Sequence, residues 1–234
     1  MPRLPLRCLG AAAMVLLSAR GARAQVPAAG ATADTIRLAP PRAKGPLSLE
    51  EALAARRSVR QWAPGQLGLG EVAQLVWAAQ GVTGPRGKRT APSALARYPI
   101  ELYVVAAAVD GLPAGAYRYL PAGHALVRLP GDPATDRRAA VAAAAGGQAS
   151  VATAPLVLVV AAQPSRFGTR TDARTDRFIA IEAGAVLQNI YLQATALHLG
   201  AVAVGGYQDE PLARALPLAA GERPMIVVPV GRRP

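Results

Sequence analysis

One long segment with an apolar stripe constrains this chain more than any other feature. Residues 176–200 read DRFIAIEAGAVLQNIYLQATALHLG, and apolar side chains recur there every three or four positions, at Ala183, Leu187, Ile190, Ala194 and Leu197. This spacing predicts an α-helix with a continuous apolar face. Val186 and Tyr191 widen that face. We therefore expect a helix that is buried from two sides, by its own domain and by a partner subunit.

Shorter helical and strand patterns flank this segment. Helical patterns cover residues 48–58, 70–81 and 132–148, and the first opens with the capping-box pair Ser48 and Glu51. Short apolar runs bounded by turn residues predict strands at 99–109, 115–120, 124–131, 155–162, 201–206 and 224–231. Together these patterns predict an α+β sandwich, with a mixed sheet packed by helices and the long helix at its centre.

The first residues have the order of a secretory signal. Arg3 and Arg7 precede a short apolar run, and Ala22-Arg23-Ala24 follows it, which predicts cleavage after Ala24. The run is shorter than the ~20 apolar residues that span a bilayer. We therefore expect a signal peptide at 1–24, a flexible Ala-, Pro- and Gly-rich linker at 25–46, and one domain at 47–234. This organisation predicts a periplasmic or secreted protein without stable membrane insertion, and a leader retained as an anchor is the alternative.

Composition excludes several classes of site. Cys8, the only cysteine, lies in the expected leader, so the mature chain has no disulfide and no thiolate nucleophile. Two distant histidines, His124 and His198, do not make a metal-ligand set, and we expect no metal. The net charge of +12 attracts anions. The basic residues nevertheless form separate clusters with few aromatic residues between them, which argues against a nucleic-acid partner.

Two short motifs do not have the context that their chemistry needs. GLGEVA, residues 68–73, resembles a dinucleotide-binding turn, but no strand precedes it. APSAL around Ser93 lacks the flanking glycines of a hydrolase nucleophile elbow. We expect the first to be an ordinary helix start, and a hydrolase is the least favoured function.

A cluster of arginines follows the first helical pattern. AARRSVRQWAPG, residues 54–65, places Arg56, Arg57, Ser58 and Arg60 within five positions. Arginine forks and a hydroxyl suit a phosphate monoester, because both donate hydrogen bonds to its oxygens. On this spacing alone, a solvated basic turn is the favoured interpretation, and a phosphate site is the alternative.

Five segments in one order carry a resemblance to a known family. They read RRSVR, LVWAAQGVT, RTAPSALARYPIELYVV, EAGAVLQNIYLQATALHLGAVAVGGYQDE and PMIVVPVG. Together they resemble the nitroreductase family, and within it the SagB/ThcOx-type dehydrogenases, over residues 47–234. The resemblance implies an α+β fold that forms a homodimer through long helices and binds FMN at the subunit interface.

The resemblance also implies roles for particular residues. Arg56, Arg57 and Ser58 would contact the FMN phosphate and ribityl chain, and Arg60 would stabilise negative charge at flavin N1 and O2. A phosphate contact would also come from one of the C-terminal arginines, Arg232 or Arg233.

Two loops complete the implied flavin site. Pro92, Ser93 and Ala94 would reach the flavin of the partner subunit. Val204, Gly205 and Gly206 would lie against the ring, with a backbone N–H near N5 and no side chain to block stacking. In this assignment Gly205, Gly206 and Arg60 are the catalytic residues, because they lie nearest the reacting atoms of the flavin. Glu182, on the long helix, fits an interface hydrogen bond or a catalytic role.

The implied function is an exported FMN-dependent oxidoreductase. It would pass hydride or electrons through flavin N5 to or from a small organic substrate in alternating half-reactions. The electron donor would be NAD(P)H or, outside the cytoplasm, a quinol. Relatives that oxidise azolines use a lysine-tyrosine pair where this chain has Arg166 and Phe167, which argues against that activity. The alternative function is a non-catalytic flavin- or anion-binding protein that keeps the fold.

Overall fold

A seven-stranded sheet forms the centre of the computed structural model, which describes residues 35–168 and 172–234. Its ladders are all antiparallel. The strands of the sheet are therefore antiparallel rather than mixed, and a single parallel bridge, from Ser58 to Ala201, lies outside them. In spatial order the strands are β1 (Thr35–Arg37), β8 (Ala125–Arg128), β7 (Gly115–Leu120), β5 (Ile100–Ala106), β9 (Leu156–Ala162), β11 (Arg223–Arg232) and β10 (Leu199–Ala201).

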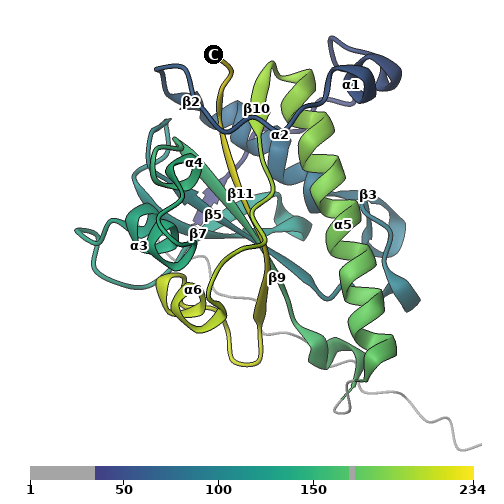
Figure 1. Ribbon diagram of the computed structural model, residues 1–234. Helices are drawn as coiled ribbons and strands as arrows, with labels where there is room; N and C mark the ends of the chain where they lie inside the picture. Colours follow the sequence, from purple (N-terminus) through teal and green to yellow (C-terminus); the bar gives the residue numbers. More distant parts are fainter. Residues whose placement is uncertain (1–34, 169–171) are drawn as a thin grey trace, which may run out of the picture. The chain divides into compact units, whose positions relative to one another are not determined.

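Helices cover both faces of this sheet (Figure 1). Side chains of successive strand residues point to opposite faces, so Leu102 and Val104 of β5 pack with one set of helices and Tyr103 and Val105 with the other. The first set is α2 (Leu69–Gln80) and α5 (Ala173–Ala196); the second is α3 (Arg137–Ala144), α4 (Ala149–Ala152) and α6 (Asp209–Ala215). The remaining α-helix of the described ranges, α1 (Leu49–Ala55), packs against α5, and the other helical segments are short 3₁₀ turns. The α+β sandwich is therefore confirmed.

The minor elements are short. Two pairs of short strands lie outside the main sheet, namely β2 (Leu67–Gly68) with β6 (Val109–Asp110) and β3 (Val82–Gly84) with β4 (Lys88–Arg89). The 3₁₀ turns are η1 (Pro85–Gly87), η2 (Ala94–Ala96), η3 (Pro121–Gly123) and η4 (Pro164–Phe167). Within the described ranges, no helix is long and apolar enough to cross a membrane.

The predicted long helix is α5, and it packs closely on α2. Its first turn is capped by the Asp172 side chain, which accepts a hydrogen bond from the Thr175 N–H at 2.9 Å. Ile190 and Tyr191 are buried as the apolar pattern predicted. The helix ends at Ala196 rather than at residue 200, because His198 adopts a positive φ of 57° and Leu199 begins β10.

Two segments differ from the sequence-based expectation. Residues 35–46 belong to the expected flexible linker, yet Thr35–Arg37 forms β1 and pairs with β8, and Leu38 is buried. The linker prediction is wrong there because backbone pairing at the sheet edge orders a segment without apolar periodicity. The expected helix at 132–148 is shorter in the structure, where α3 covers only Arg137–Ala144. It is closed by Gly146 and Gly147, which both adopt positive φ, and α4 begins after them. The expected signal peptide, residues 1–24, lies outside the described residues.

Candidate functional site

The arginine–serine motif, residues 56–60, lies at one end of the main sheet. Helix α1 begins with the predicted capping box, in which Ser48 and Glu51 exchange hydrogen bonds. The helix stops at Ala55, and Arg56 leaves it with ψ of 125°. The motif is therefore extended, and the helical pattern predicted through residue 58 is three residues too long. The Val59 N–H then donates to the Ala201 carbonyl at 2.9 Å.

A pair of glycines lets this segment lie directly on the sheet. Gly200 of β10 and Gly231 of β11 are register partners. Val59 packs over Gly200 and Trp62 over Gly231, so closely that a Cβ on either glycine would come within 2.7 or 2.8 Å of those side chains. Segment 58–63 is further fixed by the bridge from Ala63 to Arg232. Close packing on these glycines thus sets the position of the arginines.

The four predicted anion-binding side chains of the motif differ in their contacts. The Arg56 guanidinium lies 5.1 Å from the centroid of the Tyr191 ring. Arg57 folds back, and its Nη1 donates to the Ala54 and Arg56 carbonyls at the end of α1. Ser58 Oγ lies 3.3 Å from the Tyr191 hydroxyl. Within the described part of the chain, exposed Arg60 has no ion pair or hydrogen bond, so its charge is available to a ligand.

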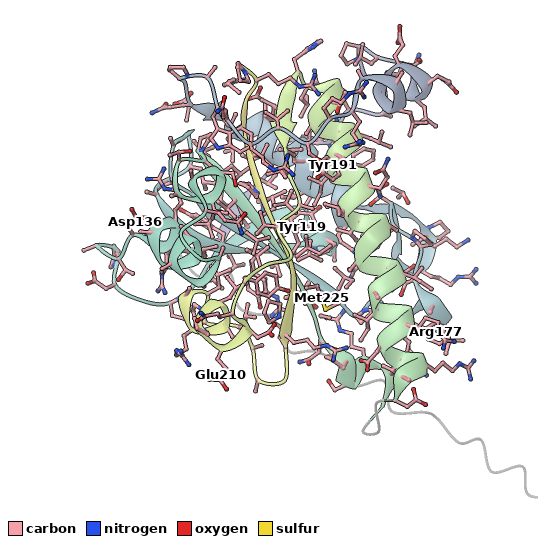
Figure 2. The ribbon with its side chains drawn as sticks, viewed as in Figure 1. Tyr119, Asp136, Arg177, Tyr191, Glu210 and Met225 are labelled. Carbon is pink, nitrogen blue, oxygen red and sulfur yellow. The ribbon has the colours of Figure 1, made fainter. Side chains whose placement is uncertain are left out.

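Tyr191 is a site residue that the sequence analysis did not assign. It lies on α5, at the end of the helix that is nearer β10, and is 8% exposed (Figure 2). Its hydroxyl accepts a hydrogen bond from the Ala203 N–H at 2.7 Å and contacts Ser58. The only signal in the sequence was a tyrosine within an otherwise apolar stripe, which does not reveal its partners.

The glycine loop, residues 203–207, is held on both sides by hydrogen bonds. Val204 exchanges two backbone hydrogen bonds with Val227 of β11, and Gln148 Nε2 donates to the Gly206 carbonyl at 3.2 Å. Gly205 is exposed, its φ is not positive, and a Cβ built on it would meet nothing within 4 Å. Neither the backbone nor packing inside the chain therefore requires glycine at this position. That pattern fits a surface kept flat for a ligand.

The two C-terminal arginines are not equivalent. Arg232 forms a paired salt bridge with Glu71 at 2.6 and 2.8 Å, and its Nε and Nη2 also donate to the Gln66 carbonyl. These bonds use most of its five N–H groups. Arg233 donates from Nε to the Leu199 carbonyl at 3.0 Å, and its Nη2 lies 3.5 Å from Thr195 Oγ1. Between these two candidates, the geometry favours Arg233 for an anionic ligand.

The loop around Ser93 lies elsewhere along α5. Pro92 is exposed, Ser93 and Ala94 are half-buried, and Ser93 Oγ accepts a hydrogen bond from the Tyr98 N–H at 2.7 Å. This loop approaches α5 near Glu182, nine residues or about 13 Å along the helix from Tyr191. Within one chain, the structure thus joins the motif, the glycine loop and the C-terminal arginines, but not the Ser93 loop.

Glu182 is buried without a hydrogen-bond partner among the described residues. Only 2% of the residue is exposed, and both carboxylate oxygens are unpaired. Burial raises the pKa of Glu182, and nearby Ser93, Arg89 and Gln80 oppose that rise in part. Arg89 donates instead to Gln80 Oε1 at 2.9 Å. The chain therefore holds, next to the Ser93 loop, a buried carboxyl group whose pKa is raised by that burial.

Comparison with known proteins assigns this arrangement to a family. The model of the nitroreductase family matches residues 53–232, from α1 to the end of β11. The chain belongs to the nitroreductase family. A protein of Methanocaldococcus jannaschii that bears a nitroreductase name is 40% identical over 187 residues, which are 80% of this chain and 92% of that protein.

Solved structures agree with the nitroreductase assignment. A crystal structure from Ralstonia eutropha JMP134, also named for a nitroreductase, has a TM-score of 0.74 and 34% identity, and covers 89% of this chain and 93% of that one. The NADPH:FMN oxidoreductase of Vibrio harveyi, complexed with NAD+, has a TM-score of 0.57 at 18% identity, over 79% and 68% of the chains. The latter similarity concerns the nitroreductase fold alone.

Proposed function

We propose that this chain is an FMN-dependent oxidoreductase that acts on a small organic substrate. One observation carries this proposal. The arginine–serine motif and the glycine loop lie together at one end of the sheet, because Ser58 of the motif and Ala203 of the loop both contact the Tyr191 hydroxyl. The cationic motif is thus joined to a loop in which Gly205 and Gly206 carry no side chain. Support also comes from the Vibrio harveyi NADPH:FMN oxidoreductase, which shares the fold.

The residues present fit a phosphorylated flavin. Arg56, Arg57, Ser58 and Arg233 offer charge and hydrogen-bond donors for a phosphate. Gly205 leaves open space where any larger residue would place a Cβ, and this space suits an aromatic ring lying on the loop. FMN, when bound, would supply hydride transfer at N5. Arg60 would contribute a positive charge that stabilises the reduced ring at N1 and O2.

A homodimer would complete this site. Helix α5 is already covered by its own domain on one side, yet its Ile181 is 63% exposed. Leu53 on the neighbouring α1 is 50% exposed, and Leu95 beside the Ser93 loop is 71% exposed. Apolar side chains this exposed favour a protein partner. In a symmetric pair, Pro92, Ser93 and Ala94 of the partner subunit would then approach the flavin.

The SagB/ThcOx branch remains our proposal for the subfamily. Arg166, however, pairs with Glu101 and with the Tyr98 carbonyl, and the Phe167 ring packs 5.9 Å from Phe178. This segment therefore offers no free proton acceptor. We therefore propose a dehydrogenase that does not oxidise azolines.

We also propose that the protein is exported, from the pattern of residues 1–24. Nicotinamide nucleotides are scarce outside the cytoplasm, so a quinol or an oxidisable organic substrate would deliver the electrons. NAD(P)H is the competing donor. No nucleic-acid partner is part of this proposal.

Absorbance spectroscopy of the full-length purified protein tests the cofactor. The expected result is a flavin spectrum, with FMN identified by chromatography after heat release. A colourless protein that also fails to bind added FMN would overturn the proposal. Anaerobic mixing with NADPH and with a soluble quinol then tests the donor. Bound flavin that no donor or substrate reduces would instead support a non-catalytic flavin-binding protein.

A further inference from the structure

The Tyr191 side chain contacts two segments that are far apart in sequence. Its hydroxyl accepts the Ala203 N–H of the glycine loop at 2.7 Å, and lies 3.3 Å from Ser58 Oγ of the arginine–serine motif. Its ring lies beneath the Arg56 guanidinium at 5.1 Å. One side chain therefore touches both halves of the candidate site. Tyr191 is nearly buried, at 8% exposure, so its own position is set by packing in α5.

The hydrogen-bond directions around the Tyr191 hydroxyl follow from its chemistry. A phenol has one proton to donate and can accept as well. Because the Ala203 N–H can only donate, the tyrosine oxygen accepts there, and its own proton is free to point at Ser58 Oγ. When the Tyr191 hydroxyl is the donor of this contact, which either atom could be, Ser58 keeps its own proton for a ligand. At 3.3 Å this contact is longer than the typical ~2.8 Å of an O–H···O bond, so it orients the serine without locking it.

The Tyr191 ring acts on Arg56 in a different way. A guanidinium over an aromatic face is attracted by the negative charge of the ring face. The neighbouring Arg57 donates instead to the Ala54 and Arg56 backbone carbonyls. Arg56 is thus held beside Ser58 without losing its hydrogen-bond donors to an acid. Both groups that Tyr191 arranges on this side are suited to a phosphate.

We infer that Tyr191 is a positioning residue that makes the site prefer a flavin carrying a terminal phosphate over riboflavin. The inference rests on the proposed function, because it concerns the same flavin site. Loss of the hydroxyl frees Ser58 to point elsewhere, which weakens phosphate binding. Loss of the hydrogen bond to Ala203 affects the glycine loop under the flavin ring. This ring is common to FMN and riboflavin, so both flavins should be affected equally. The ratio of the two affinities therefore isolates the phosphate effect.

The test measures dissociation constants of FMN and riboflavin by fluorescence titration of the full-length protein after flavin removal. We expect Tyr191→Phe to lower the FMN-to-riboflavin affinity ratio by about fivefold, as for loss of one hydrogen bond. Tyr191→Leu, which also removes the ring beneath Arg56, should lower the ratio further. Tyr119→Phe is the matched control, because that buried hydroxyl bonds to His124 at 2.9 Å; its ratio should equal that of wild type.

A double-mutant cycle identifies the route of the effect. If Tyr191 acts through Ser58, the loss of FMN affinity in Ser58→Ala and Tyr191→Phe together should be smaller than the sum of the two separate losses. An unchanged ratio in Tyr191→Phe, an equal loss for both flavins, or additive losses would overturn the inference. Wild-type protein that binds neither flavin would overturn the proposed function itself, so the two failures are distinguishable.

Discussion

Gly200 and Gly231 face each other across the β10–β11 ladder, and each lies under a large side chain of segment 58–63. Val59 and Trp62 fill the space that a Cβ would need. Trp62 is also anchored by its Nε1, which donates to the Ser150 carbonyl at 3.0 Å. The distance between the sheet and the arginine–serine motif is therefore set by two residues that have no side chain.

Substitution of either glycine should displace the motif. Gly200→Ala and Gly231→Ala would force the segment outward, because the new Cβ would lie within 2.8 Å of Val59 or Trp62. We expect a destabilisation of about 1–3 kcal/mol, as for overpacking, and weaker flavin binding. Thermal unfolding and flavin titration measure both. Gly70→Ala is the control, since its Cβ would meet nothing within 4 Å; equal losses in the control would contradict the prediction.

Gly205→Ala should separate folding from ligand binding. The position has open space and no positive φ, so the substitution should keep or raise stability, by up to about 1 kcal/mol through the unfolded chain. The added methyl group would nevertheless meet a ring stacked on the loop. We expect about a tenfold loss of FMN affinity, as for mild overpacking, with a melting temperature that is unchanged or higher. Normal flavin binding by this variant would show that the ring lies elsewhere.

The C-terminal arginines should respond differently to substitution. Arg232→Met removes the paired salt bridge to Glu71 and the bonds to Gln66, so it should mainly lower the melting temperature. Arg233→Met should mainly weaken FMN and have less effect on riboflavin, because Arg233 keeps N–H groups for a phosphate. Differential scanning calorimetry and flavin titration distinguish the two. The reverse pattern would assign the phosphate contact to Arg232.

Glu182→Gln should change how stability depends on pH. Burial raises the pKa of Glu182 above the ordinary 4.5, with Ser93, Arg89, Gln80 and Arg166 opposing the rise. The folded state therefore binds this proton more tightly than the unfolded state does. Its stabilising contribution is full below pH 4.5 and is lost as pH rises through the raised pKa.

The expected result is a stability difference that varies with pH. Glutamine does not titrate, so Glu182→Gln should gain stability relative to wild type as pH rises from 4.5 towards neutrality. Urea unfolding of both proteins at a series of pH values measures this. A difference that stays constant over the series would mean that Glu182 keeps an ordinary pKa in the folded protein.

Local patterns in the sequence predicted much of the fold. The three-and-four spacing of Ile190 and its neighbours predicted α5, and the apolar runs predicted β5 and β9. These signals are reliable because helix and strand periods depend on residues close in the chain. The edge strand β1 was missed, since its order comes from pairing with β8 rather than from its own composition.

The candidate site was only partly predictable. The order of motifs, from RRSVR to the glycines at 205 and 206, indicated the family and the anion-binding groups. It did not distinguish Arg232 from Arg233, because the acid that binds Arg232 is Glu71, 161 residues earlier. The spacing of a motif does not show whether an acid from a distant part of the chain already binds one of its arginines.

By itself, the sequence determined most of the helices and strands, β1 excepted, and indicated candidate charged groups for a flavin site. Only the tertiary structure decided how these groups are arranged. The contact of Ser58 with Tyr191 spans 133 residues, and the glycine pair acts only because β10 and β11 meet in register. The physical reason is that side-chain periodicity is a local property, whereas strand order and register bring distant residues into contact.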